Sequence, residues 1–176
     1  RATPGDMDAV VLARAGIERL GLGARITEIL SADLLLPAPG QGAIGIEICE
    51  GDTRVRRLLA GREDPDTRSA VDAERAFLRA LGGGCQVPVG ALARSAGDRL
   101  QLEGMVADPD GVRLLRGRRA GRASDAEAIG EGLAHELIGQ GAAEILGEME
   151  RRAGAPERTD RPDEGPTSGP RSGGVA

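Results

Sequence analysis

One cysteine in an unusually open stretch of chain is the residue best suited to chemistry. Cys85 follows three consecutive glycines, Gly82–Gly84, and precedes Gln86-Val87-Pro88. A glycine inside a helix or strand costs roughly 0.5–1 kcal/mol relative to alanine, so this run predicts a connector rather than a regular element. The proline restricts the residue before it to extended geometry. We therefore expect a connector that presents the thiol with no side chains crowding it.

Three roles are open to this thiol. A free cysteine commonly packs as a small hydrophobic residue. A hydrolytic thiolate is disfavoured, because Cys85 follows the C-terminal end of a predicted helix, where the helix dipole is negative. The single histidine, His135, lies on a predicted surface helix, off its apolar stripe, and is not a usable base. The glycines favour the third role, a slow capture of a strong electrophile that then stays attached, since a bulky adduct needs space around the backbone.

A long amphipathic helix is expected to aim the Cys85 loop. Asp64 is its predicted N-cap and Pro65 its first residue. Apolar residues at spacings of three and four give the helix one apolar face: Ala70, Val71, Phe77, Leu78 and Leu81. Gly82 then ends the helix.

After Cys85 the hydrophobic pattern takes the period of strands. Strands are predicted over residues 89–93, 99–107 and 112–119. Asp108–Gly111 is a strong turn signal. Ser124–Glu127 has the form of a capping box and opens a helix that ends near Gly139–Gly141, with more helix over 142–149. The pattern predicts an α+β domain, in which a three-stranded antiparallel sheet packs on helices.

The N-terminal third has a different pattern. Asp8–Ala13 and Ala43–Cys49 are predicted strands, and the first has the apolar run of a strand covered on both faces. Arg14–Leu20 and Asp52–Ala60 are predicted short helices, and Pro37–Gly42 is a turn-rich connector. A covered strand needs neighbours and few precede this one. We therefore expect the first residue to be a cut through a larger protein.

Composition excludes several classes of protein. The net charge is −5 and all 23 basic residues are arginine, which disfavours a general nucleic-acid partner. Two cysteines, one of them Cys49, which we interpret as a packing residue, do not form a disulfide framework, and with one histidine they do not form a zinc site. No run of 18 apolar residues and no signal peptide is visible. We expect a cytoplasmic protein that does not enter membranes.

Two segments are interpreted as solvated. The arginine-rich Arg113–Arg122 segment could attract an anionic partner, but a solvated strand face is the preferred interpretation. From Arg151 onward the sequence is rich in glycine, proline and charged residues and poor in apolar ones. Such a segment cannot bury enough surface to offset its ordering entropy, so residues 151–176 are predicted to be disordered.

Three stretches resemble the porphobilinogen deaminase family, also called hydroxymethylbilane synthase, in their order and spacing. They are the Cys85 loop, Gly82–Gly90; the connector and the strand after it, Leu36–Glu47; and the first strand and helix, Asp8–Gly21. The resemblance runs from about Asp8 to about Met149. It implies a C-terminal portion of that three-domain fold: residues 1–62 from the two α/β domains, 63–150 as the cofactor-attachment domain, and the tail.

The resemblance also implies residue roles. Cys85 would form a thioether to a dipyrromethane cofactor. Arg19 would contact a carboxylate of the pyrrole chain, which suits the bidentate pairing of a guanidinium. Gln41 and Gly42 would contact the cofactor. No metal is implied. The family's catalytic aspartate lies in an N-terminal part that this chain does not contain, so no catalytic residue is assigned here.

The implied activity is polymerisation of four porphobilinogen units into a linear tetrapyrrole, with loss of ammonia, in tetrapyrrole biosynthesis. Its partners would be porphobilinogen and the growing oligopyrrole, and the full-length enzyme is expected to be a monomer. The fragment alone is expected to be inactive. The alternatives are a non-enzymatic α+β binding module, which would carry no covalent pyrrole, and a thiol hydrolase, which would react with an acyl electrophile.

Overall fold

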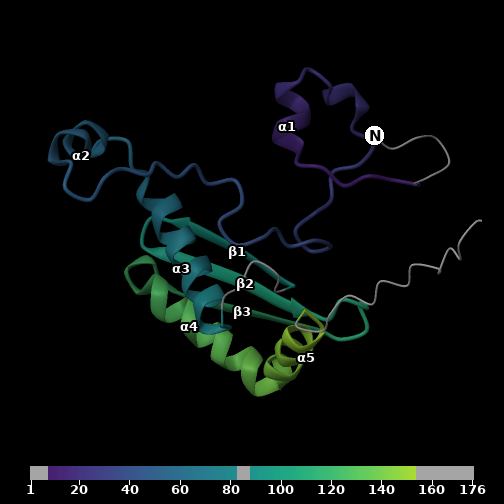
Figure 1. Cartoon of the computed structure of the whole chain (residues 1–176). Coiled ribbons are helices and arrows are strands. Elements are labelled where there is room, and N and C mark those ends of the chain that lie inside the picture. The colour runs from purple at the N-terminus through teal and green to yellow at the C-terminus, as the bar shows by residue number, and fades with distance from the viewer. Residues whose placement is uncertain (1–7, 83–87, 154–176) are drawn as a thin grey trace, which may run out of the picture.

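The computed structural model describes residues 8–82 and 88–153 (Figure 1). The N-terminal part carries two short helices, α1 (Arg14–Arg19) and α2 (Thr53–Leu59), joined by long irregular segments. The C-terminal part begins with helix α3 (Pro65–Ala80) and continues into the three strands β1 (Val89–Ala96), β2 (Arg99–Ala107) and β3 (Leu114–Arg122). Helices α4 (Ala126–Leu137) and α5 (Ala143–Ala153) complete it.

The three strands form one antiparallel sheet in the order β1–β2–β3. Val89 of β1 lies opposite Val106 of β2, and Ala107 lies opposite Leu114 of β3. Helices α3 and α4 lie across one face of the sheet, as Figure 1 shows. The predicted α+β architecture, a three-stranded antiparallel sheet packed on helices, is confirmed.

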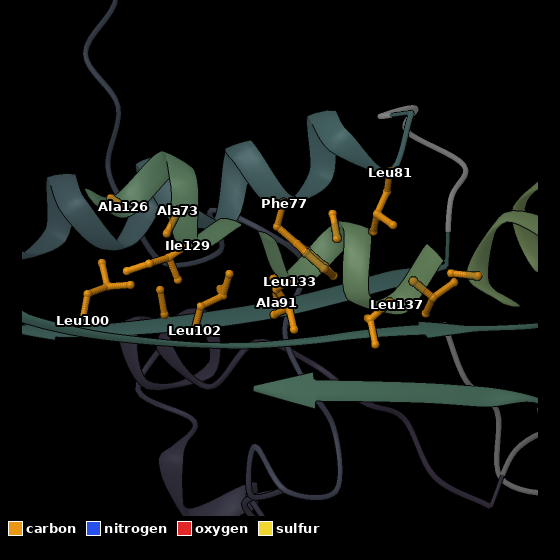
Figure 2. Packing of buried hydrophobic residues seen from close by; sticks show 14 of the residues in the cluster. Ala73, Phe77, Leu81, Ala91, Leu100, Leu102, Ala126, Ile129, Leu133 and Leu137 are labelled. Atoms are coloured by element: carbon orange, nitrogen blue, oxygen red, sulfur yellow. The ribbon is translucent and has the colours of Figure 1, made fainter. Parts of the chain in front are cut away.

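The core lies between this sheet and the two helices (Figure 2). Alternate residues of β2 point toward the helices because successive side chains of a strand face opposite ways. The largest fully buried side chains are Phe77, Leu100, Leu102, Leu133, Leu137 and Val106. The single aromatic ring of the chain lies over Gly104, where an added Cβ would come within 2.5 Å of the Phe77 ring. The lack of a side chain at Gly104 thus leaves room on the sheet for the Phe77 ring.

Helices α3 and α4 are in close contact at Gly130. A Cβ there would lie 2.3 Å from the carbonyl oxygen of Ala73, a backbone atom that cannot turn aside. We expect Gly130→Ala to destabilise the domain by about 1–3 kcal/mol, because the helices must separate. Urea denaturation measures this loss. Gly139→Ala is the matched control, since Gly139 has open space around it. Equal urea midpoints for the two variants would contradict the prediction.

The start of α3 follows its sequence signal. The Asp64 side chain accepts a hydrogen bond from the Thr67 amide at 2.7 Å, and Pro65 occupies the first helical position. This bond satisfies a backbone donor that the helix leaves free and lowers the pKa of Asp64.

The start of α4 differs from the prediction. Ser124 does not cap the helix, because a 3₁₀ turn over Ala123–Asp125 precedes it and no side chain makes a capping hydrogen bond. The Ser124 hydroxyl instead bonds to the Asp125 carboxylate at 3.1 Å. At the other end, Gly141 takes a φ of 109° and lets the chain turn into α5. That helix runs to Ala153, past the residue where the tail was predicted to begin, and residues 154–176 lie outside the described part.

The two strands predicted in the N-terminal third are absent. Residues 8–13 and 43–49 pair with no strand in the described structure, and most of their apolar side chains are exposed, up to 89% at Ile44. A strand needs a neighbour for its backbone groups, and the described residues supply none for these two. The short helices do form, each within about a residue of its prediction, and the Asp52 side chain caps α2 through the Val55 amide at 2.9 Å.

Candidate functional site

The predicted attachment residue, Cys85, lies outside the described residues, between Gly82 and Pro88. The structure describes both ends of this loop. Leu81, at the end of α3, is buried in the core, and β1 begins at Val89, which packs against the same core. Gly82 takes a φ of 94°, a conformation that L side chains rarely adopt. The loop therefore leaves and rejoins the domain at two fixed points.

The connector, residues 37–42, carries the two predicted cofactor contacts, Gln41 and Gly42. Its backbone makes a turn in which the Gln41 amide donates to the Ala38 carbonyl at 3.0 Å. Gly40 and Gly42 have φ values of 76° and 87°, so glycine is required at both positions. No atom lies within 4 Å of a Cβ built on either glycine. The connector is turn-rich as predicted and leaves open space beside Gly42.

A buried carboxylate, which the sequence reasoning missed, fixes this connector to the domain. Glu74 on α3 is only 6% exposed. One of its oxygens accepts from the Gly40 amide at 2.6 Å and the other accepts from the Ala93 amide of β1 at 2.7 Å. Charge-assisted hydrogen bonds of this kind are stronger than neutral ones. The sequence feature that could have revealed Glu74 is its place on the apolar face of the helix, three positions before Phe77.

The connector also lies along the edge of the sheet. The Ala91 amide of β1 donates to the Pro37 carbonyl at 2.9 Å. Leu36 is 5% exposed and covers Gly90, where an added Cβ would come within 2.8 Å of the Leu36 Cβ. The connector and the start of β1, which follows the Cys85 loop, are thus held against each other.

Comparison with known proteins identifies the family. Residues 1–57 match the family model "Porphobilinogen deaminase, dipyromethane cofactor binding domain", and residues 69–139 match "Porphobilinogen deaminase, C-terminal domain". The chain belongs to the porphobilinogen deaminase family. It is 54% identical over 142 residues to the porphobilinogen deaminases of Roseiflexus castenholzii and of Thiobacillus denitrificans, and 51% identical over 152 residues to that of Bordetella parapertussis.

These alignments cover 81–86% of this chain and 46–48% of the relatives. The chain therefore spans about half the length of the curated porphobilinogen deaminases that it matches. The cofactor of this family is a dipyrromethane, which the N-terminal model names in its description. The two family models match the chain on either side of residues 58–68, a range that includes the start of α3.

The remaining predicted site residue, Arg19, lies exposed at the end of α1. No hydrogen bond or ion pair among the described residues joins it to Gln41 or Gly42, so its role stays a prediction. Cys49 was predicted to pack in a core, and that prediction is wrong because it is exposed. The segment around it joins no sheet, so nothing covers the side chain.

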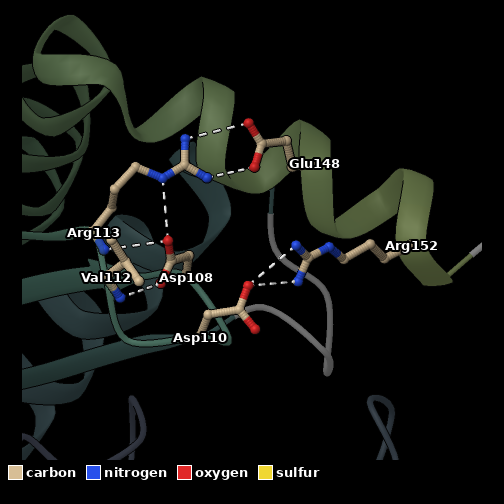
Figure 3. Close-up of polar contacts among 6 residues, drawn as sticks. All are labelled: Asp108, Asp110, Val112, Arg113, Glu148 and Arg152. Carbon is tan, nitrogen blue, oxygen red and sulfur yellow. Dashed lines mark hydrogen bonds and ion pairs between the residues drawn. The ribbon is translucent and has the colours of Figure 1, made fainter.

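Most arginines of the Arg113–Arg122 segment have partners within the chain. The Arg113 guanidinium bonds to Asp108 and to Glu148 of α5, and Arg152 pairs with Asp110 at 3.1 Å (Figure 3). The hydrogen bond from Arg113 lowers the pKa of Glu148. Together these pairs join the β2–β3 turn to α5, and they favour the paired, solvated face over a site for an anionic partner.

No group of histidine, cysteine, aspartate or glutamate side chains in the described part of the chain could hold a metal ion.

Proposed function

We propose that this protein is the C-terminal portion of a hydroxymethylbilane synthase. The enzyme joins four porphobilinogen units into a linear tetrapyrrole, and each addition breaks a carbon–nitrogen bond, forms a carbon–carbon bond and releases ammonia. The observation that supports this most is the Gly-rich Cys85 loop, placed between α3 and β1 in a chain that matches both family models. "Full-length enzyme" below means this chain together with the N-terminal portion that we propose precedes it.

Three glycines of the described part leave space beside the backbone that a dipyrromethane would need. No neighbouring atom lies within 4 Å of a Cβ built on Gly82, Gly40 or Gly42, so the chain leaves space directly beside its backbone at these points. Cys85 would hold the group through a thioether, and Gln41 and Gly42 would contact it. When bound, the group supplies the pyrrole on which the product grows. The chain's own contribution is to fix both ends of the thiol loop and to hold the connector in place through Glu74.

Arg19 is proposed to bind a carboxylate of the growing pyrrole chain. Removing one charge-assisted pair costs about 1.5–3 kcal/mol, or roughly tenfold to a hundredfold in rate. We expect Arg19→Leu in the full-length enzyme to lower turnover by that factor and to leave shorter enzyme-bound intermediates. Native mass spectrometry resolves those intermediates. Arg25→Leu, at a similarly exposed arginine of the next turn, is the control. Wild-type turnover with wild-type intermediates would assign Arg19 to the solvated surface.

The catalytic carboxylate is proposed to lie in the N-terminal portion of the full-length enzyme. The chemistry develops positive charge on a pyrrole, which a nearby carboxylate must stabilise. The 176-residue chain alone should therefore form no tetrapyrrole, whereas the full-length enzyme should form it from porphobilinogen. Ammonia release and tetrapyrrole absorbance measure both. Sustained turnover by the 176-residue chain would show that one of its own carboxylates does the chemistry.

The proposed partners are porphobilinogen and the growing oligopyrrole, and the full-length enzyme is proposed to be a cytoplasmic monomer. In the part of the chain that the structure describes, no helix is both long and apolar enough to span a bilayer.

A further inference from the structure

A second carboxylate lies on the face of the sheet opposite the helices. Glu103 on β2 has a side chain only 11% exposed, and one of its oxygens accepts from Arg116 at 2.6 Å and from Arg118 at 2.9 Å, both on β3. Burial raises the pKa of Glu103, but the hydrogen bonds from Arg118 and Arg116 outweigh burial, so the pKa lies below its ordinary value. The carboxylate is charged at neutral pH and holds both guanidinium groups in place.

The Arg116 guanidinium also reaches a distant part of the chain. One of its terminal nitrogens donates to the Ala32 carbonyl at 2.8 Å, and the other donates to the Asp33 carbonyl. Arg118 adds a weaker pair with the Asp33 side chain at 3.4 Å. A planar guanidinium fixed on one edge by a carboxylate can present its remaining donors in a defined direction. Arg116 therefore joins the sheet to the residues that lead into the connector.

The contacts that follow along the chain are spaced a few residues apart. After Ala32 and Asp33, the next anchor is the buried side chain of Leu36. The Pro37 carbonyl then accepts a hydrogen bond from β1, and the Gly40 amide donates one to Glu74. Gln41 and Gly42 come directly after the last of these. Arg116 is the first anchor in the series, and among the described residues it is the one that fixes two successive carbonyls of the segment leading into the connector.

We propose that Arg116, held by Glu103, is a positioning residue for the connector and thereby sets the conformation in which Gln41 and Gly42 face the cofactor site. The last step, that this conformation turns Gln41 and Gly42 toward the cofactor site, rests on the proposed function. The first step, that Arg116 restrains residues 32–42, does not rest on it.

Hydrogen exchange in the 176-residue chain tests the first step. Three amides of this segment are hydrogen-bonded: those of Leu34 and Leu35 donate to the Ser31 carbonyl, and that of Gly40 donates to Glu74. In Arg116→Leu, we expect these amides to exchange about tenfold faster, while amides of β2 and α4 keep their rates. Glu103→Gln, which leaves the arginine but removes the charge that orients it, should give a smaller increase of the same pattern. Arg122→Leu, on the same strand and without an ion pair among the described residues, should change none of them.

Kinetics of the full-length enzyme tests the second step. Arg116→Leu should lower kcat about tenfold with KM nearly unchanged and cofactor still attached, and Arg116→Lys, which can bond to one carbonyl, should recover part of the loss. If exchange in residues 32–42 stays at wild-type rates in Arg116→Leu, or rises equally throughout the domain, Arg116 is not a positioning residue. Faster local exchange with unchanged kcat would confirm the restraint but overturn its role in the reaction. The hydrogen-exchange experiment needs no turnover. Its result therefore separates a failure of this proposal from a failure of the proposed function.

Discussion

Replacing Cys85 with serine in the full-length enzyme should abolish tetrapyrrole synthesis while the protein remains folded. A serine hydroxyl is a far weaker nucleophile than a thiolate at neutral pH, so no stable ether to the dipyrromethane would form. The residues that fix the ends of the loop, Leu81 and Val89, are untouched. We expect turnover at background and a melting temperature close to that of the wild-type enzyme prepared without cofactor.

Cys49→Ser is the matched control for this experiment. Cys49 is an exposed thiol on an irregular segment, so its chemical accessibility is not in doubt. Its replacement should leave both attachment and turnover at wild-type values. If Cys85→Ser kept a covalent pyrrole, or if Cys49→Ser lost it, the assignment of the attachment thiol would be wrong.

Replacing the buried Glu74 with leucine should strongly destabilise the domain. The Gly40 and Ala93 amides would each lose a charged acceptor, the first in a part-buried and the second in a buried hydrogen bond. Hydrogen bonds to charged groups contribute about 1.5–3 kcal/mol each, so we expect a loss of about 3 kcal/mol or more. For a domain of this size that corresponds to a fall in melting temperature of roughly 12–24 °C.

Two variants make this result interpretable. Glu74→Gln keeps one acceptor oxygen and should lose about half as much stability. Glu131→Leu, at an exposed position of α4, controls for the loss of a surface charge and should melt near the wild type. Equal melting temperatures for Glu74→Leu and Glu131→Leu would mean that the two hydrogen bonds contribute no net stability.

The C-terminal domain could be predicted because its signals are local. The strand over Arg99–Ala107 alternates between core and open face along its length, and its predicted ends match the observed ones. Asp64 followed by Pro65 marks the start of α3, since both residues act on the first turn alone. Turns with Gly97 and Gly111 at positive φ join the strands, and their sequence preference is also a local property.

What could not be predicted depends on distant contacts. The run Asp8–Ala13 has the composition of a buried strand, but it forms none here because strand formation depends on neighbours that composition does not reveal. Glu74 and Arg116 carry no sequence motif, since their partners, Gly40 and Ala32, lie tens of residues earlier in the chain. Ser124 fits a capping pattern, but a preceding 3₁₀ turn places it one residue away from the capping position.

The most direct test of the account is the location of the cofactor on the full-length enzyme. Trypsin cleaves after arginine, and this places Cys85 in the peptide of residues 80–94 and Cys49 in the separate peptide of residues 26–54. Mass spectrometry of the digest should find the dipyrromethane mass on the 80–94 peptide and an unmodified 26–54 peptide. A pyrrole on the 26–54 peptide, or no covalent pyrrole on an enzyme that makes tetrapyrrole, would contradict the attachment site on which the account depends.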